Sequence, residues 1–130
     1  MSVPKSERRQ SLQEYVVILQ QVEQFFLNQN LSDKYRIPLL SEELCRLSME
    51  AYNDATRIFE MTIGTIRGTV ADKKKYCKKA IWTIRELAAQ INIMVAFRMS
   101  NHYPVTGMVE ITQKLLKAIE LIEIQLDSLH

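Results

Sequence analysis

Apolar residues recur three and four positions apart along much of this chain, the spacing that places them on one face of an α-helix. The earliest such segment begins at Ser11-Leu12-Gln13-Glu14. This is a capping-box pattern, in which serine and glutamate side chains accept hydrogen bonds from free amide groups at a helix start. We therefore expect a first helix over residues 11–29. Its apolar stripe comprises Leu12, Tyr15, Val16, Leu19, Val22 and Phe26.

A second helix is expected from Pro38 to about Gly68, after a connector over residues 31–36. Proline fits the first helical turn, where its missing N–H removes no hydrogen bond. Glycine commonly follows the last turn, because it readily adopts the left-handed conformation found there. The apolar stripe of this helix comprises Leu40, Leu44, Leu47, Ala51, Ala55 and Ile58.

A third helix is expected to start near Thr69 or Asp72. It should end at Asn101-His102-Tyr103-Pro104, because the residue before a proline avoids helical geometry. Thr106 can then cap a fourth helix. The stripe of the third helix is Tyr76, Ala80, Ile84, Leu87, Ile91, Met94 and Val95, and that of the fourth is Met108, Ile111, Leu115, Ala118, Ile122 and Leu126.

Four amphipathic helices with short connections predict an all-α, up-down-up-down four-helix bundle. We expect one domain over residues 11–130, preceded by a flexible basic N-terminus over residues 1–10. The composition agrees, since 47% of the residues are hydrophobic and only three are glycine and three proline. Apolar residues outside the main stripes predict a second buried face and self-association. They are Val17, Ile18, Phe25, Ile81 and Ile93.

The cysteines and the apolar segments favour a cytoplasmic protein. Cys45 and Cys77 lack the spacing of a zinc site, so we expect buried free thiols, as in a reducing compartment. The first residues contain no apolar signal core, and no apolar run approaches the roughly 18 residues that span a bilayer. We expect neither a metal, nor a cofactor, nor a membrane partner.

Basic residues concentrate at the start of the third helix, although the net charge is only +2. Cations at a helix start are repelled by the helix dipole, and an anionic partner would offset that cost. Lys74, Lys78 and Arg85 share one helical face. The run is equally consistent with a solvated surface that keeps the protein soluble. The complete set is Lys73, Lys74, Lys75, Lys78 and Lys79, with Arg67 before it and Arg85 after it.

No arrangement of residues predicts catalysis. Arg98 and His102 are similar to the Arg–His motif of the helical HEPN ribonucleases, but three residues separate them where that motif has four to six. Trp82 adjoins the apolar stripe of the third helix, and we expect it in the core or a subunit interface rather than stacked on a base.

Acidic residues of the second helix do not form a metal site, because di-metal bundles need Glu-x-x-His motifs on facing helices. We expect these carboxylates to face solvent as partners of Arg46 and Arg57. They belong to Glu42, Glu43, Glu50, Asp54 and Glu60.

Two segments resemble known families. Ala80-Ile81-Trp82-Thr83-Ile84-Arg85-Glu86-Leu87-Ala88-Ala89-Gln90-Ile91-Asn92-Ile93 resembles the Ala-x-x-Ser/Thr-x-x-Glu-Leu-x-x-Gln-Leu-x-Ile helix of the 23S rRNA intervening-sequence proteins. Asp33-Lys34-Tyr35-Arg36 followed by Leu39-Leu40-Ser41-Glu42-Glu43-Leu44 is similar to a helix start in a sister group. That group contains the accessory variability determinants of diversity-generating retroelements. The resemblance covers roughly Leu12 to Leu126.

The resemblance implies a non-enzymatic homo-oligomer, typically a pentameric ring. In the retroelement group the ring presents basic surface to RNA or DNA and docks on the reverse transcriptase. By position, the nucleic-acid-binding residues here would be Lys73, Lys74, Lys75, Lys78, Lys79 and Arg85, with Arg67 adjoining.

The chain also departs from both groups. Residues 119–126 lack the glycine-containing segment and tryptophan of the retroelement group, and residues 59–64 lack the Asn followed by Glu-Gly of the intervening-sequence group. Three functions therefore stay open: an accessory scaffold that binds nucleic acid and a reverse transcriptase, an adaptor for an acidic protein, and a ribonuclease of the helical toxin class.

Overall fold

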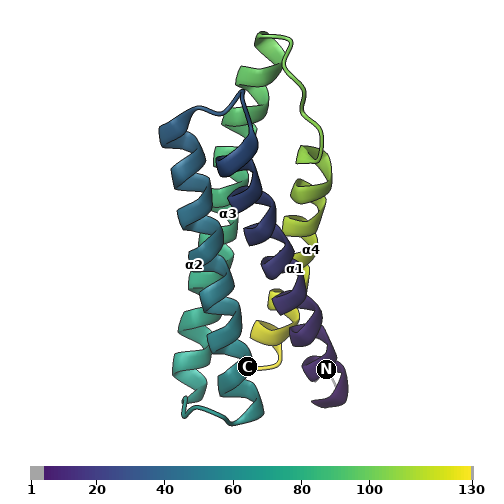
Figure 1. Ribbon diagram of the computed structural model, residues 1–130. Coiled ribbons are helices and arrows are strands. Elements are labelled where there is room, and N and C mark those ends of the chain that lie inside the picture. The colour runs from purple at the N-terminus through teal and green to yellow at the C-terminus, as the bar shows by residue number, and fades with distance from the viewer. Residues whose placement is uncertain (1–4, 130) are drawn as a thin grey trace.

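Four α-helices account for most of residues 5–129, the part of the chain that the computed structural model describes (Figure 1). They are α1 (Lys5–Ser32), α2 (Pro38–Ile63), α3 (Val70–Ser100) and α4 (Met108–Asp127). The predicted all-α class and the four-helix bundle are confirmed. Connections 33–37 and 101–107 lie at one end of the bundle, and connection 64–69 lies at the other. Within residues 5–129, none of these helices is sufficiently long and apolar for a membrane crossing.

The core lies where the four apolar stripes meet. α1 packs against α2 and α4, and α3 packs against the same two helices from the other side. The side chains of Tyr15, Leu47, Ile84 and Leu115, one from each helix, are almost fully buried in a single hydrophobic cluster. Burial of apolar surface is the main favourable term in folding, so these stripes hold the bundle together.

The start of α1 differs from our prediction. The helix begins at Lys5, and Ser11 lies inside it, where its hydroxyl donates to the Glu7 carbonyl oxygen at 2.9 Å. Residues 5–10, expected to be flexible, are therefore helical, while residues 1–4 lie outside the described part. Gln125 of α4 donates to the Arg8 carbonyl oxygen at 2.7 Å, so tertiary contact supports the added turns.

Two glycines correct two other predicted helix ends. α2 ends at Ile63 instead of Gly68, because Gly64 adopts a left-handed φ of 88° and donates its N–H to the Glu60 carbonyl oxygen. Only glycine reaches this conformation at little cost. α4 starts after Gly107, whose φ is 84°, so the predicted cap at Thr106 is wrong. The predicted position of Pro38 in the first turn of α2 is confirmed.

A buried ion pair joins the two connections at one end of the bundle. The Arg98 side chain, from the last turns of α3, pairs with the Asp33 carboxylate and donates to the Pro104 carbonyl oxygen at 3.0 Å. Arg98 is only 4% exposed. The Tyr35 and Tyr103 rings stack beside it with centroids 4.4 Å apart. These contacts fix connections 33–37 and 101–107 to each other.

We expect Asp33→Ala to lower the free energy of unfolding by about 3 kcal/mol, because it leaves a buried guanidinium without its counter-charge. Urea unfolding followed by circular dichroism measures this change. Asp127→Ala, at an exposed position of α4, is the control and should change stability by less than about 0.5 kcal/mol. Equal effects of the two substitutions would contradict a stabilising role for the pair.

Candidate nucleic-acid interface

The basic segment follows a capping box at the start of α3, which lies where the sequence predicts a helix start, near Thr69. Thr69 is the cap of α3, and its hydroxyl oxygen accepts the Asp72 N–H at 3.1 Å. The Asp72 carboxylate accepts the Thr69 N–H in return at 3.0 Å, which lowers the pKa of this carboxyl. A carboxylate in the first turn also interacts favourably with the helix dipole. Asp72 therefore offsets part of the unfavourable interaction between the helix dipole and the lysines that follow.

The candidate basic residues do not share one surface. Lys75, Lys78 and Arg85 are exposed on the outer side of α3, and Lys74 is half-buried at its edge. Arg67 is exposed, but it lies in the connection before α3. We call Lys74, Lys75, Lys78 and Arg85 the outer basic face.

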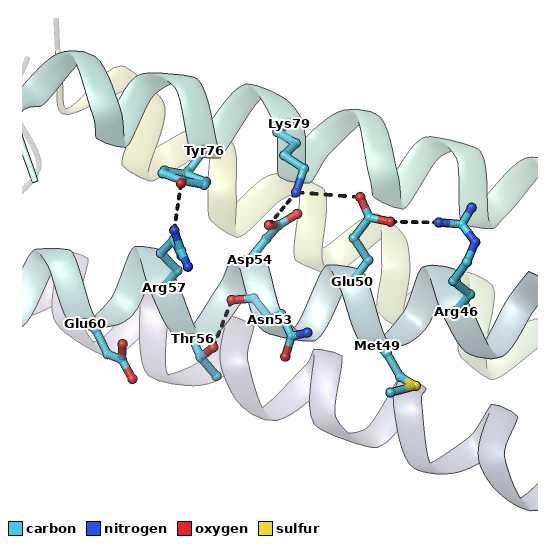
Figure 2. A pocket seen from close by; sticks show the side chains of 10 residues that line it. All are labelled: Arg46, Met49, Glu50, Asn53, Asp54, Thr56, Arg57, Glu60, Tyr76 and Lys79. Atoms are coloured by element: carbon cyan, nitrogen blue, oxygen red, sulfur yellow. Dashed lines mark hydrogen bonds and ion pairs between the residues drawn. The ribbon is translucent and has the colours of Figure 1, made fainter. Parts of the chain in front are cut away.

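Two of the lysines point elsewhere. Lys73 is half-buried and lines a small cavity with Cys77 and Gln125, on the side of α3 that faces the bundle. The Lys79 ammonium lies 3.0 Å from the Asp54 carboxylate and 3.6 Å from the Glu50 carboxylate, both on α2. Figure 2 shows this bridge between the helices. The Lys79 ammonium is therefore already ion-paired within the chain.

A groove of about 630 Å³ lies between α2 and α3 around this bridge (Figure 2). Its charges are largely paired with one another. Arg46 binds Glu43 at 2.5 Å and Glu50 at 3.1 Å, as the sequence predicts. Arg57 donates to the Tyr76 hydroxyl oxygen at 2.8 Å. Because three cations and three carboxylates line the groove, it has no excess of positive charge to attract an external anion.

Asp54 corrects our expectation that the acidic residues of this helix face solvent. It is 5% exposed and pairs with Lys79, not with Arg57. Its second carboxylate oxygen, the Tyr15 hydroxyl and the Thr83 hydroxyl are buried without hydrogen-bond partners within the described residues. Desolvation raises the pKa of Asp54, although the Lys79 hydrogen bond opposes that rise. Burial and the nearby Asp54 charge also raise the pKa of Tyr15.

Both cysteines are buried free thiols, as predicted. The Cys45 thiol donates to the Phe26 carbonyl oxygen at 3.2 Å. Burial raises the pKa of Cys77 to about 11. A thiol must lose its proton to act as a nucleophile or a metal ligand, so Cys77 is suited to packing instead. No group of three or more potential metal ligands lies together among residues 5–129.

Trp82 lies on the outer side of α3 with 64% of its surface exposed. The predicted core location is therefore wrong, while a subunit interface stays a prediction. Of the five apolar residues that lie outside the main stripes, Val17 and Ile93 are exposed, Phe25 is half-buried, and Ile18 and Ile81 are buried. Ile81 lies at the edge of the buried face of α3, one residue from Trp82, and helical geometry turns their side chains apart.

Arg98 and His102 do not form a free catalytic pair. The Arg98 guanidinium is buried against Asp33 and the Pro104 carbonyl oxygen, so it is not available to an RNA phosphate. His102 is exposed in the connection after α3, with a left-handed φ of 59°. This geometry gives no support to a ribonuclease site at these residues.

Comparison of the chain with protein-family models, with curated proteins and with solved structures finds no match. The relationship to the intervening-sequence and retroelement groups therefore stays a prediction based on the residues quoted above.

The raised pKa of Asp54 predicts the pH dependence of stability. The folded state binds this proton more tightly than the unfolded state, so the associated stability is present at low pH and lost as the pH rises through the raised pKa. Asp54→Asn removes the titration and keeps the shape of the side chain. We expect wild-type stability to fall relative to Asp54→Asn as the pH rises from about 4 to about 7.

Urea unfolding of both proteins across this pH range measures the difference. Glu60→Gln is a matched control, since Glu60 lines the same groove but is exposed. Stability curves of wild type and Asp54→Asn that run parallel with pH would show that burial of Asp54 does not oppose its ionisation.

Proposed function

We propose that this protein is a non-enzymatic accessory protein that binds RNA or DNA through the outer basic face of α3. The observation that carries the proposal is the placement of Lys74, Lys75, Lys78 and Arg85. These four cations follow one side of one helix, and none forms an ion pair with any residue in the described part of the chain.

Phosphate binding suits this face better than it suits the groove beside it. In the groove Arg46 and Lys79 are paired with the carboxylates of Glu43, Glu50 and Asp54. The third cation, Arg57, is hydrogen-bonded to the Tyr76 hydroxyl. On the outer basic face the charges remain free to replace the counterions around a nucleic-acid backbone. Release of those counterions drives binding and makes its affinity fall as salt rises. A helix surface with a row of cations needs no enclosed pocket for such contacts.

Self-association extends the proposal. The alternating ends of the connections support an up-down-up-down topology, and the resemblance to the retroelement accessory group supports a homo-oligomeric, typically pentameric, ring in the cytoplasm. Exposed apolar side chains of α3 and α4 provide surface for subunit contacts. A ring would repeat the outer basic face around its circumference and would present it to a nucleic acid and a reverse transcriptase. The apolar residues are Ile93, Phe97, Val109 and Leu116.

Neutralising the outer basic face should weaken binding. We expect the triple variant Lys75→Gln, Lys78→Gln and Arg85→Gln to bind a short structured RNA and a duplex DNA about tenfold more weakly near physiological salt, with a shallower salt dependence. Fluorescence anisotropy at low and moderate salt measures both quantities.

The matched control removes the same charges elsewhere. Lys34→Gln, Arg36→Gln and Lys117→Gln replace two exposed lysines and one exposed arginine away from the start of α3. Equal losses in the two triple variants would show that net charge, and not this face, governs binding. Absence of wild-type binding even at low salt, with capture of an acidic protein by the same face, would replace the proposal with an adaptor function.

The oligomer has its own test. Light scattering coupled to gel filtration should give about five times the mass of one chain for a pentameric ring. A charge at an apolar contact is costly to bury, so we expect Ile93→Glu to reduce the mass. Leu39→Glu, at an exposed position in the first turn of α2, is the comparison, because Leu39 belongs to neither of the apolar sets assigned to subunit contacts. A monomeric wild-type protein would overturn the ring.

A further inference from the structure

Trp82 is unusual because a large aromatic side chain lies open to solvent in the middle of a charged surface. It is the single tryptophan of the chain and is 64% exposed. Tryptophan buries more apolar area than any other residue when it finds a partner. In the bundle most of the Trp82 side chain stays exposed to water, which points to a binding partner outside the chain.

The surroundings of Trp82 are mainly cationic. Residues three and four positions away are neighbours on a helix surface, and these are Lys78 and Lys79 before it and Arg85 and Glu86 after it. Lys79 turns toward Asp54 and Glu50 on α2, and Glu86 is half-buried. The exposed indole therefore lies within the outer basic face.

A second copy of the chain is a poor partner for this part of α3. A two-fold contact through the outer basic face would bring like charges together. A head-to-tail contact in a ring would have to bury Lys78 and Arg85, which have no ion-pair partner within the described residues, beside the indole. The exposed apolar residues Ile93 and Phe97 provide a separate surface farther along α3. At 1.5 Å rise per residue, Ile93 lies roughly 16 Å from Trp82 along the helix axis.

An unpaired nucleotide is chemically complementary to this surface. Its phosphate is an anion for Lys78 or Arg85, and its base offers a flat face that stacks on an indole. In a duplex both faces of each base are already covered by neighbouring bases, so an indole on a helix surface gains little from it. The combination of cations and an exposed aromatic ring therefore favours single strands.

We propose that Trp82 stacks on an unpaired base and gives α3 a preference for single-stranded over duplex nucleic acid. This inference rests on the proposed nucleic-acid binding by the same face. It assigns the cations to the phosphate backbone and assigns Trp82 to the distinction between single strands and duplexes.

The test uses Trp82 as its own probe. A short unstructured RNA, a DNA strand of the same length and the corresponding duplex are titrated into the full-length protein at one salt concentration, with tryptophan emission and oligonucleotide anisotropy recorded together. We expect both single strands to quench the emission saturably. Trp82→Ala should weaken single-strand binding about tenfold and leave duplex affinity within about twofold, while Trp82→Phe should retain most of the affinity.

Met99→Ala is the matched control, because Met99 lies on the same helix with the same 64% exposure but outside the outer basic face. It should change neither affinity. Circular dichroism checks that each variant keeps its helices.

Three results would overturn the inference. The first is equal loss of single-strand and duplex affinity in Trp82→Ala, and the second is unchanged affinity without quenching by any strand. The third is a blue shift of the emission with protein concentration alone, which would place Trp82 in a subunit interface. Failure of the proposed function differs from all of these, because the wild-type protein would then bind neither single strands nor duplex, and the inference would fall with it.

Discussion

Each helix of this bundle can bury only one side, and the surface of the protein follows from that constraint. α3 packs against α2 and α4 through residues such as Ala80, Ile84 and Leu87. Helical geometry then turns Lys75, Lys78, Trp82 and Arg85 away from the bundle. The outer basic face therefore results from the core packing of α3, and a change of register in that packing would rotate these charges inward.

Two charged pairs tie the bundle together at places where apolar packing alone leaves freedom. Asp33 and Arg98 join the connections at one end, and Asp54 and Lys79 join α2 to α3 near the middle. Asp33, Asp54 and Arg98 are largely buried, so losing a partner costs far more than an exposed pair would. The Asp54–Lys79 pair also separates the basic residues of α3 into two groups, because it directs Lys79 toward α2 and away from the surface that we propose for nucleic acid.

The helix ends show which features of the fold a local sequence pattern can predict and which it cannot. The start of α3 near Thr69, where Thr69 and Asp72 form a capping box, and the position of Pro38 were predictable because each depends on neighbouring residues only. Ser11 carries the same kind of pattern, yet it lies inside α1, where residues 5–10 extend the helix and α4 contacts Arg8. Gly64 and Gly107 determine their helix ends through positive φ angles, and either Gly64 or Gly68 could have ended α2 as far as the sequence pattern shows.

By itself, the sequence determined the helical class, the four apolar stripes, the buried thiols and the concentration of charge at the start of α3, since each depends on residue type and periodic spacing. Tertiary structure alone decided which of those charges are free. Asp33 and Arg98 are 65 positions apart, and Asp54 and Lys79 are 25 apart, so no local spacing signals either pair. The same holds for the exposure of Trp82. Its neighbours in sequence are apolar or small, but whether a helix side faces a partner or water depends on how the other three helices pack around it.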